Sequence, residues 1–167
     1  MIDDASPPII ILLITTRTFY GEQRMKKLYP YLAYAGTLPF IACASYLLFN
    51  KVQFPILGSI EKVLSVYALV IASFLAGAHW GQHLHLDGKW SRILPISSNI
   101  IVVTLWLAFL VLPFKILLSL FIAAFFLLLL IDYYLFKKNV ITLSYFKTRC
   151  YATAIVILTL IISRIAS

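Results

Sequence analysis

Hydrophobic residues in this chain fall into five long runs that are separated by short polar turns. A helix needs about 20 apolar residues to cross a hydrocarbon core of about 30 Å, and each run is close to that length. The runs cover residues 28–49, 61–86, 93–112, 116–136 and 145–165. We therefore predict an all-α integral membrane bundle of five transmembrane helices, which forms one domain over residues 26–167.

The composition favours a fold that faces lipid. Hydrophobic residues make up 62% of the 167 residues and charged residues 12%, which is more apolar surface than a soluble core needs. The net charge is +8, but no basic patch with interleaved aromatic residues lies on a soluble segment. We therefore expect membrane lipid as a partner, a membrane-protein partner or a homo-oligomer in addition, and no nucleic acid.

Residues 1–25 precede the first span and match no targeting pattern. Asp3 and Asp4 come before an apolar run, Ile9–Ile14, that is too short to cross a bilayer. A secretory signal would begin with basic residues, and an organellar presequence would avoid acidic ones. We interpret this segment as a loosely ordered N-terminal extension to the membrane domain.

Lysine and arginine residues are divided unevenly between the two ends of the predicted bundle. Of the fourteen, ten lie at the end that holds the N-terminus and the turns near residues 89 and 138. The opposite end has Lys51, Lys62, Lys115 and Arg164. The positive-inside rule then predicts an N-terminus inside and a C-terminus outside. We expect a bacterial inner membrane, with the mitochondrial inner membrane as the alternative.

Most of the polar chemistry lies in the stretch Tyr67–Trp90. His79 and His83 are four residues apart, so a helix places them on one face. Neutral imidazoles bind metals and haem iron, which makes these two residues the candidate metal ligands, although no glutamate completes an HExxH pattern. Alternatively, Ser98 and Asn99 lie level with His79 on the next span and can hold its ring by hydrogen bonds.

Asp132, near the end of the fourth span, lies level with Arg149 on the fifth. A carboxylate at the bilayer centre costs roughly 2.5 to 3.5 kcal/mol, and an arginine partner offsets this cost. We predict a structural ion pair between Asp132 and Arg149. The functional alternative is a polar pocket near the basic end, able to hold a quinone head group or to relay a proton. Its candidate residues are His79, Trp80, Ser98, Asn99 and Asp132.

Three segments resemble a known group of small membrane proteins. They are LAYAGTLPF in the first span, YALVIASFLAGAHWG in the second and the fourth-span ending at Asp132. They are similar to the bacterial and mitochondrial membrane proteins grouped as domain of unknown function 3429. The similarity covers about residues 26–165, and its most specific part is the string from Ser73 to Gly81.

The resemblance implies a multi-span membrane protein in which His79 and Trp80 belong to the shared pattern, and it brings no established activity. His83 and His85 fall outside that pattern, which argues against three histidines acting together. Because the chain shows no catalytic motif, we expect a non-enzymatic assembly, scaffold or partner-binding subunit. Two alternatives remain: a redox-linked quinone- or haem-binding protein that uses His79, and a small proton-coupled carrier.

Overall fold

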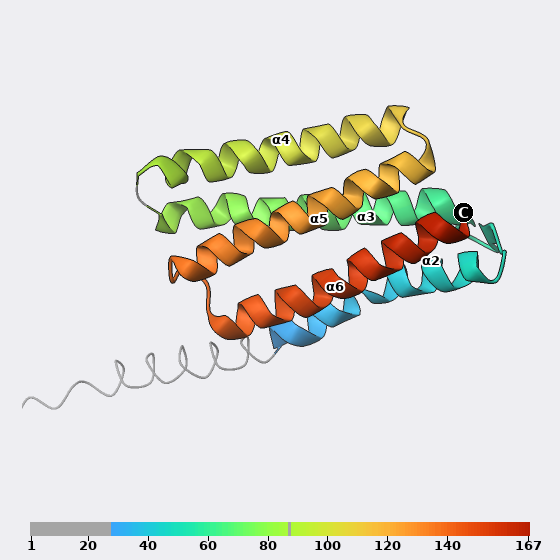
Figure 1. Ribbon diagram of the computed structural model, residues 1–167, viewed down its shortest axis with the longest axis horizontal. Coiled ribbons are helices and arrows are strands. Elements are labelled where there is room, and N and C mark those ends of the chain that lie inside the picture. Colours follow the sequence, from blue (N-terminus) through green and yellow to red (C-terminus); the bar gives the residue numbers. More distant parts are fainter. Residues whose placement is uncertain (1–27, 87) are drawn as a thin grey trace, which may run out of the picture.

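The computed structural model describes residues 28–86 and 88–167, and five helices in these ranges are long and apolar enough to cross a membrane. They run side by side in one bundle (Figure 1). The first span is Leu28–Leu48, which ends in α2 (Leu38–Leu48). The others are α3 (Ile60–Gln82), α4 (Lys89–Val111), α5 (Phe114–Lys137) and α6 (Leu143–Ala166). The predicted five-helix membrane bundle is confirmed, and the predicted extension over residues 1–25 lies outside the described residues.

Short connections join the helices. Between α2 and α3, the strands β1 (Gln53–Phe54) and β2 (Gly58–Ser59) pair antiparallel, with Gly58 at a positive φ of 80° that favours glycine. This small ladder is an addition to the predicted all-α architecture. Between α4 and α5, the chain turns at Leu112 and Pro113, and the two helices are therefore antiparallel neighbours.

The second and third spans have different bounds from those predicted. The helix α3 ends at Gln82, after which the one-turn helix η1 (His83–His85) follows. Gly88, at a φ of 74°, then turns the chain directly into α4 at Lys89. The predicted second span continued through η1 because Leu84 and Leu86 are apolar.

The helix α3 contacts α2, α4 and α5, while α6 packs against α2 and α5. The buried face of α3 carries alanines at every fourth position, Ala68, Ala72 and Ala76, which are fully buried. Such small side chains let helix backbones approach each other in lipid. Phe40 of α2 and Phe125 of α5 fill the space beside them, with their rings 6.0 Å apart edge to face.

The first span is interrupted at Gly36 and Thr37, between helical residues 28–35 and α2. Pro39 has no backbone N–H, so it fits the first turn of α2 but not a continuous helix. The freed carbonyl of Gly36 accepts a hydrogen bond from the Tyr67 hydroxyl at 3.0 Å. The interruption matters for the site because Gly36 and Thr37 both line a cavity.

Candidate functional site

Three side chains from three different helices form a buried hydrogen-bonded chain. The His79 Nε2 on α3 lies 2.8 Å from Oδ1 of Asp132 on α5. The Arg149 Nε on α6 donates to the other carboxylate oxygen, Oδ2, at 2.9 Å. The exposed fraction of the side chain is 1% for His79, 0% for Asp132 and 7% for Arg149. We call them the His79–Asp132–Arg149 triad.

The triad explains how the spans accommodate ionised groups. A buried charge is tolerated where it is paired and where hydrogen bonds satisfy it. The Asp132 carboxylate has one donor on each oxygen, and the Arg149 guanidinium balances its charge. This contact between Asp132 and Arg149 is the ion pair expected from the sequence. His79 adds a third helix to it.

One nitrogen of His79 remains without a protein partner. When Nε2 donates to the carboxylate, the neutral ring carries a lone pair on Nδ1. The Nδ1 atom is buried and has no hydrogen-bond partner among the described residues. His79 therefore holds a buried position that can accept a proton without breaking the contact with Asp132.

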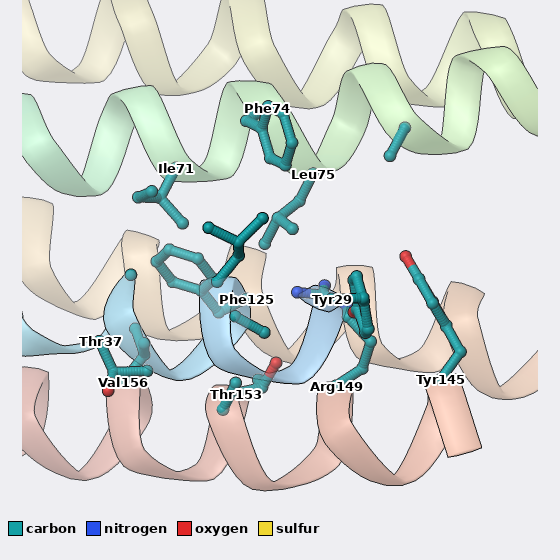
Figure 2. Close-up of a pocket in the computed structure, with 15 residues that line it drawn as sticks. Tyr29, Thr37, Ile71, Phe74, Leu75, Phe125, Tyr145, Arg149, Thr153 and Val156 are labelled. Atoms are coloured by element: carbon teal, nitrogen blue, oxygen red, sulfur yellow. The ribbon is translucent and has the colours of Figure 1, made fainter. Parts of the chain in front are cut away.

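A cavity of about 300 Å³ lies beside the triad (Figure 2). Its walls come from residues 29–37 of the first span and from α3, α5 and α6, and this volume is at the lower end of the range for small-molecule sites. Figure 2 shows Ile71 and Leu75 reaching into this region from α3, and Arg149 and Thr153 from α6. Most of the lining is apolar.

The polar end of the cavity is formed by Tyr29, Tyr145 and Arg149. The two tyrosine rings stack with their centroids 4.7 Å apart. The Tyr29 hydroxyl is buried without a partner in the described part of the chain. Within residues 28–86 and 88–167, Arg149 makes one side-chain hydrogen bond, through Nε to Asp132. The other guanidinium N–H groups are therefore donors available to a molecule in the cavity.

The cavity borders the lipid-facing surface. Leu32 and Phe74 line it and are 62% and 72% exposed, although both lie within spans. An exposed apolar side chain in a transmembrane helix faces acyl chains. These two residues place one edge of the cavity at the surface of the described part of the bundle, between the first span and α3.

Residues 25–165 match the family described as Protein of unknown function (DUF3429). The chain belongs to the DUF3429 family. The match covers all five spans, so the resemblance noted in the sequence is confirmed. No curated protein and no solved structure matches the chain.

In this DUF3429 protein, the predicted polar pocket is only partly assembled. His79 and Asp132 are in contact, but the Ser98 hydroxyl donates to the Leu94 carbonyl of its own helix at 2.8 Å. Asn99 is exposed on the outer face of α4. The predicted support of His79 by these two residues is therefore wrong. A serine within a helix readily bonds back to the fourth preceding carbonyl, and Asp132 takes the place facing the imidazole.

Trp80 also lies apart from the triad. Its side chain is 49% exposed, and its ring meets that of His83 edge to face at 5.1 Å. It follows His79 directly on α3, so it points about 100° away around the helix axis. This position fits the interfacial aromatic belt and removes Trp80 from the candidate pocket.

The two predicted metal candidates have separate partners. The His83 Nδ1 is hydrogen-bonded to the Trp80 carbonyl, whereas the His79 Nε2 faces Asp132. Among the residues that the structure describes, no group of three or more His, Cys, Asp and Glu side chains is placed to hold a metal ion. The side chain of His85 lies outside the described residues.

The sequence interpretation did not find the cavity. The predicted role of Arg149 was its ion pair with Asp132. A usable signal was present on α6, where Tyr145, Arg149 and Thr153 recur at every fourth position and therefore share one helical face. All three line the cavity.

Proposed function

We propose that this protein is a non-enzymatic binding protein for a small amphipathic molecule that enters the cavity from the bilayer. One observation carries the proposal: Arg149, fixed by Asp132, presents its remaining donors to a mainly apolar cavity of about 300 Å³. An apolar pocket with a few convergent polar groups is the usual form of a small-molecule site.

The chemistry at the polar end supports binding. A guanidinium stays protonated and donates hydrogen bonds, and the hydroxyls of Tyr29 and Tyr145 are neutral donors. Groups of this kind recognise a head group that accepts hydrogen bonds. The apolar walls then suit the hydrocarbon part of the same molecule.

The quinone alternative from the sequence fits this cavity in a modified form. Quinone carbonyls accept hydrogen bonds, and Arg149 and Tyr29 supply donors at the polar end. In this version the contact with the head group moves from His79, which does not line the cavity, to Arg149. A haem macrocycle is larger than the cavity, so the proposal does not include haem.

An assembly or partner-binding role is the second candidate, and α4 supports it. In the most apolar stretch of α4, 17% of the residues are buried inside the bundle, which is the lowest share among the five spans. Trp106, Leu107 and Leu110 are each at least half exposed on this helix. A membrane-protein partner or a second copy of the chain can pack on this face.

We propose that the protein lies in a bacterial inner membrane, or alternatively in the mitochondrial inner membrane.

The test is mass spectrometry of molecules that copurify with the protein in mild detergent. Wild type is compared with Ala78→Phe, which fills the cavity, and with Ala123→Phe, which places the same ring on the exposed face of α5. We expect one small amphipathic molecule with wild type and Ala123→Phe, and its loss with Ala78→Phe.

A wild-type protein that carries no such molecule would contradict binding in the cavity. Equal retention by all three proteins would place the molecule elsewhere. Copurification of a stoichiometric membrane protein with all three, and of no small molecule, would support the assembly role instead. Matching melting temperatures for the two variants would show that loss of the molecule does not reflect unfolding.

A further inference from the structure

We infer that the cavity takes a carboxylate with a single apolar chain, a molecule of the fatty-acid class, and that binding it places a proton on His79. This inference rests on the proposed function and specifies its ligand. It starts from the shared position of Asp132, whose two carboxylate oxygens contact His79 and Arg149.

The polar end of the cavity is best suited to an anion. Arg149 lines the cavity and contacts Asp132 through Nε, so its remaining guanidinium N–H groups can serve a ligand there. Hydrogen bonds from a guanidinium to a carboxylate are charge-assisted and frequently bidentate, and the opposite charges attract each other strongly where water is excluded. The Tyr29 hydroxyl adds a further donor at the same end.

The charge balance then requires a second cation. With His79 neutral, Asp132 and Arg149 cancel each other. A carboxylate placed against Arg149 leaves two anions and one cation in a buried region, which is costly at low dielectric. A proton on the His79 Nδ1 restores neutrality, because the imidazolium then balances Asp132 through Nε2 while Arg149 balances the ligand.

Other titratable groups surround the Asp132 carboxylate. Those within its electrostatic field are Tyr29 in the first span and Arg149, Tyr145 and Cys150 on α6. The charged residues of α4 are Lys89 and Arg92, and both are exposed. On the α3 side, the His83 ring is bonded to the Trp80 carbonyl. Imidazole is the side chain that ordinarily changes charge near neutral pH, and His79 is the one bonded to Asp132.

The size and opening of the cavity favour one chain. A volume of about 300 Å³ does not hold a phospholipid with two acyl chains. Leu32 and Phe74 line the cavity and are exposed, so the end of a long chain can extend into the bilayer. A fatty acid and an alkyl phosphate are both anions with a single apolar chain. A carboxylate is favoured over a phosphate because it carries one negative charge, which the one proton on His79 compensates.

The experiment measures binding of decanoate, decyl phosphate, decanol and decylubiquinone to the full-length protein in nanodiscs, with empty nanodiscs as background. Calorimetry in buffers of different ionisation enthalpy gives the protons taken up per bound molecule. We expect decanoate to bind at least tenfold more tightly than the two neutral probes, with uptake of about one proton. By linkage, its affinity then rises about tenfold for each unit that the pH falls between 8 and 6.

Two variants assign the proton. His79→Gln can still donate to Asp132 but cannot take up a proton, whereas His83→Gln is the matched control on the same helix. We expect no proton uptake and at least tenfold weaker decanoate binding in His79→Gln, and wild-type behaviour in His83→Gln. Carbon-13 NMR of carboxyl-labelled decanoate should show the ionised carboxylate in the bound state.

The outcomes separate this inference from the proposed function. Equal binding of decanoate, decanol and decylubiquinone without proton uptake would overturn the inference and leave a neutral amphipathic ligand. Tighter binding of decyl phosphate would overturn the carboxylate assignment. A pH-independent affinity in wild type, or a bound protonated acid, would overturn the role of His79, even if His79→Gln failed to fold. If no probe binds, and if Ala78→Phe does not change which molecules copurify, the proposed function itself is contradicted.

Discussion

Asp132 connects three helices through two oxygen atoms. His79 and Arg149 approach it from α3 and α6, and all three groups are almost fully buried. A buried ion pair contributes little net stability compared with apolar residues of similar size, but losing one partner leaves a charge without compensation. The triad therefore makes the α3, α5 and α6 packing sensitive to the ionisation of a single carboxylate.

Asp132→Asn tests this sensitivity. The amide keeps the size of the side chain but leaves the Arg149 guanidinium uncompensated, so we expect a loss of about 3–5 kcal/mol in the free energy of unfolding. The measurement is denaturant or thermal unfolding in detergent. Tyr133→Phe, on the exposed neighbouring position, should be close to wild type. The double variant Asp132→Asn with Arg149→Met should recover most of the loss, and an unstable double variant would argue against charge as the cause.

The interruption of the first span sets the position of residues 28–35 relative to α2. The Gly36 carbonyl at this interruption accepts a hydrogen bond from the Tyr67 hydroxyl. Tyr67→Phe removes this donor and leaves a partly buried acceptor unpaired, which typically costs about 1–3 kcal/mol. Unfolding experiments should show this loss for Tyr67→Phe and none for Tyr151→Phe, whose ring is 63% exposed. Equal effects in the two variants would show that the contact with Gly36 is not the cause.

The small residues of α3 separate into a packed face and an open face. Ala76 is fully buried, whereas the adjacent Gly77 is exposed, and a Cβ added to it meets nothing within 4 Å. We expect Ala76→Leu to destabilise the bundle by about 1–3 kcal/mol through overpacking, and Gly77→Leu to be tolerated. Thermal unfolding of the pair checks this. A larger loss for Gly77→Leu would mean that another helix covers this face in the membrane.

The distribution of charge predicts how the bundle is oriented. Lys89, Arg92, Lys137, Lys138 and Lys147 are exposed at the end where α3 meets α4 and α5 meets α6. Arg149 is sequestered in the triad, so it does not act as a surface charge, but the excess at this end remains when the basic residues before the first span are counted. We predict that this end faces the cytoplasm or matrix. Alkaline phosphatase fused after Ser167 should be active in a bacterial host, because it is active only outside the cytoplasm. Fluorescence from green fluorescent protein fused at the same position would contradict this orientation, because that reporter fluoresces only in the cytoplasm.

Hydropathy predicts the spans well because the thickness of lipid fixes the length of an apolar helix. It also led to the contact between Asp132 and Arg149, since a short turn sets the depth of both residues. Depth does not determine how each helix is rotated about its axis. For that reason the sequence does not show that Ser98 bonds to its own helix, that Asn99 is exposed, or that Asp132 is the partner of His79. The cavity depends on the same rotation of four helical segments.

All three tryptophans stand outside the cavity. Trp80, Trp90 and Trp106 are 49%, 37% and 51% exposed, and none of them belongs to its lining. Their intrinsic fluorescence therefore reports on the surrounding bilayer, and brominated acyl chains should quench Trp106 directly. A ligand carrying a fluorophore would receive energy from these natural donors without competing with them for space. Energy transfer from the native tryptophans to a fluorescent ligand can therefore measure how much of the cavity is occupied.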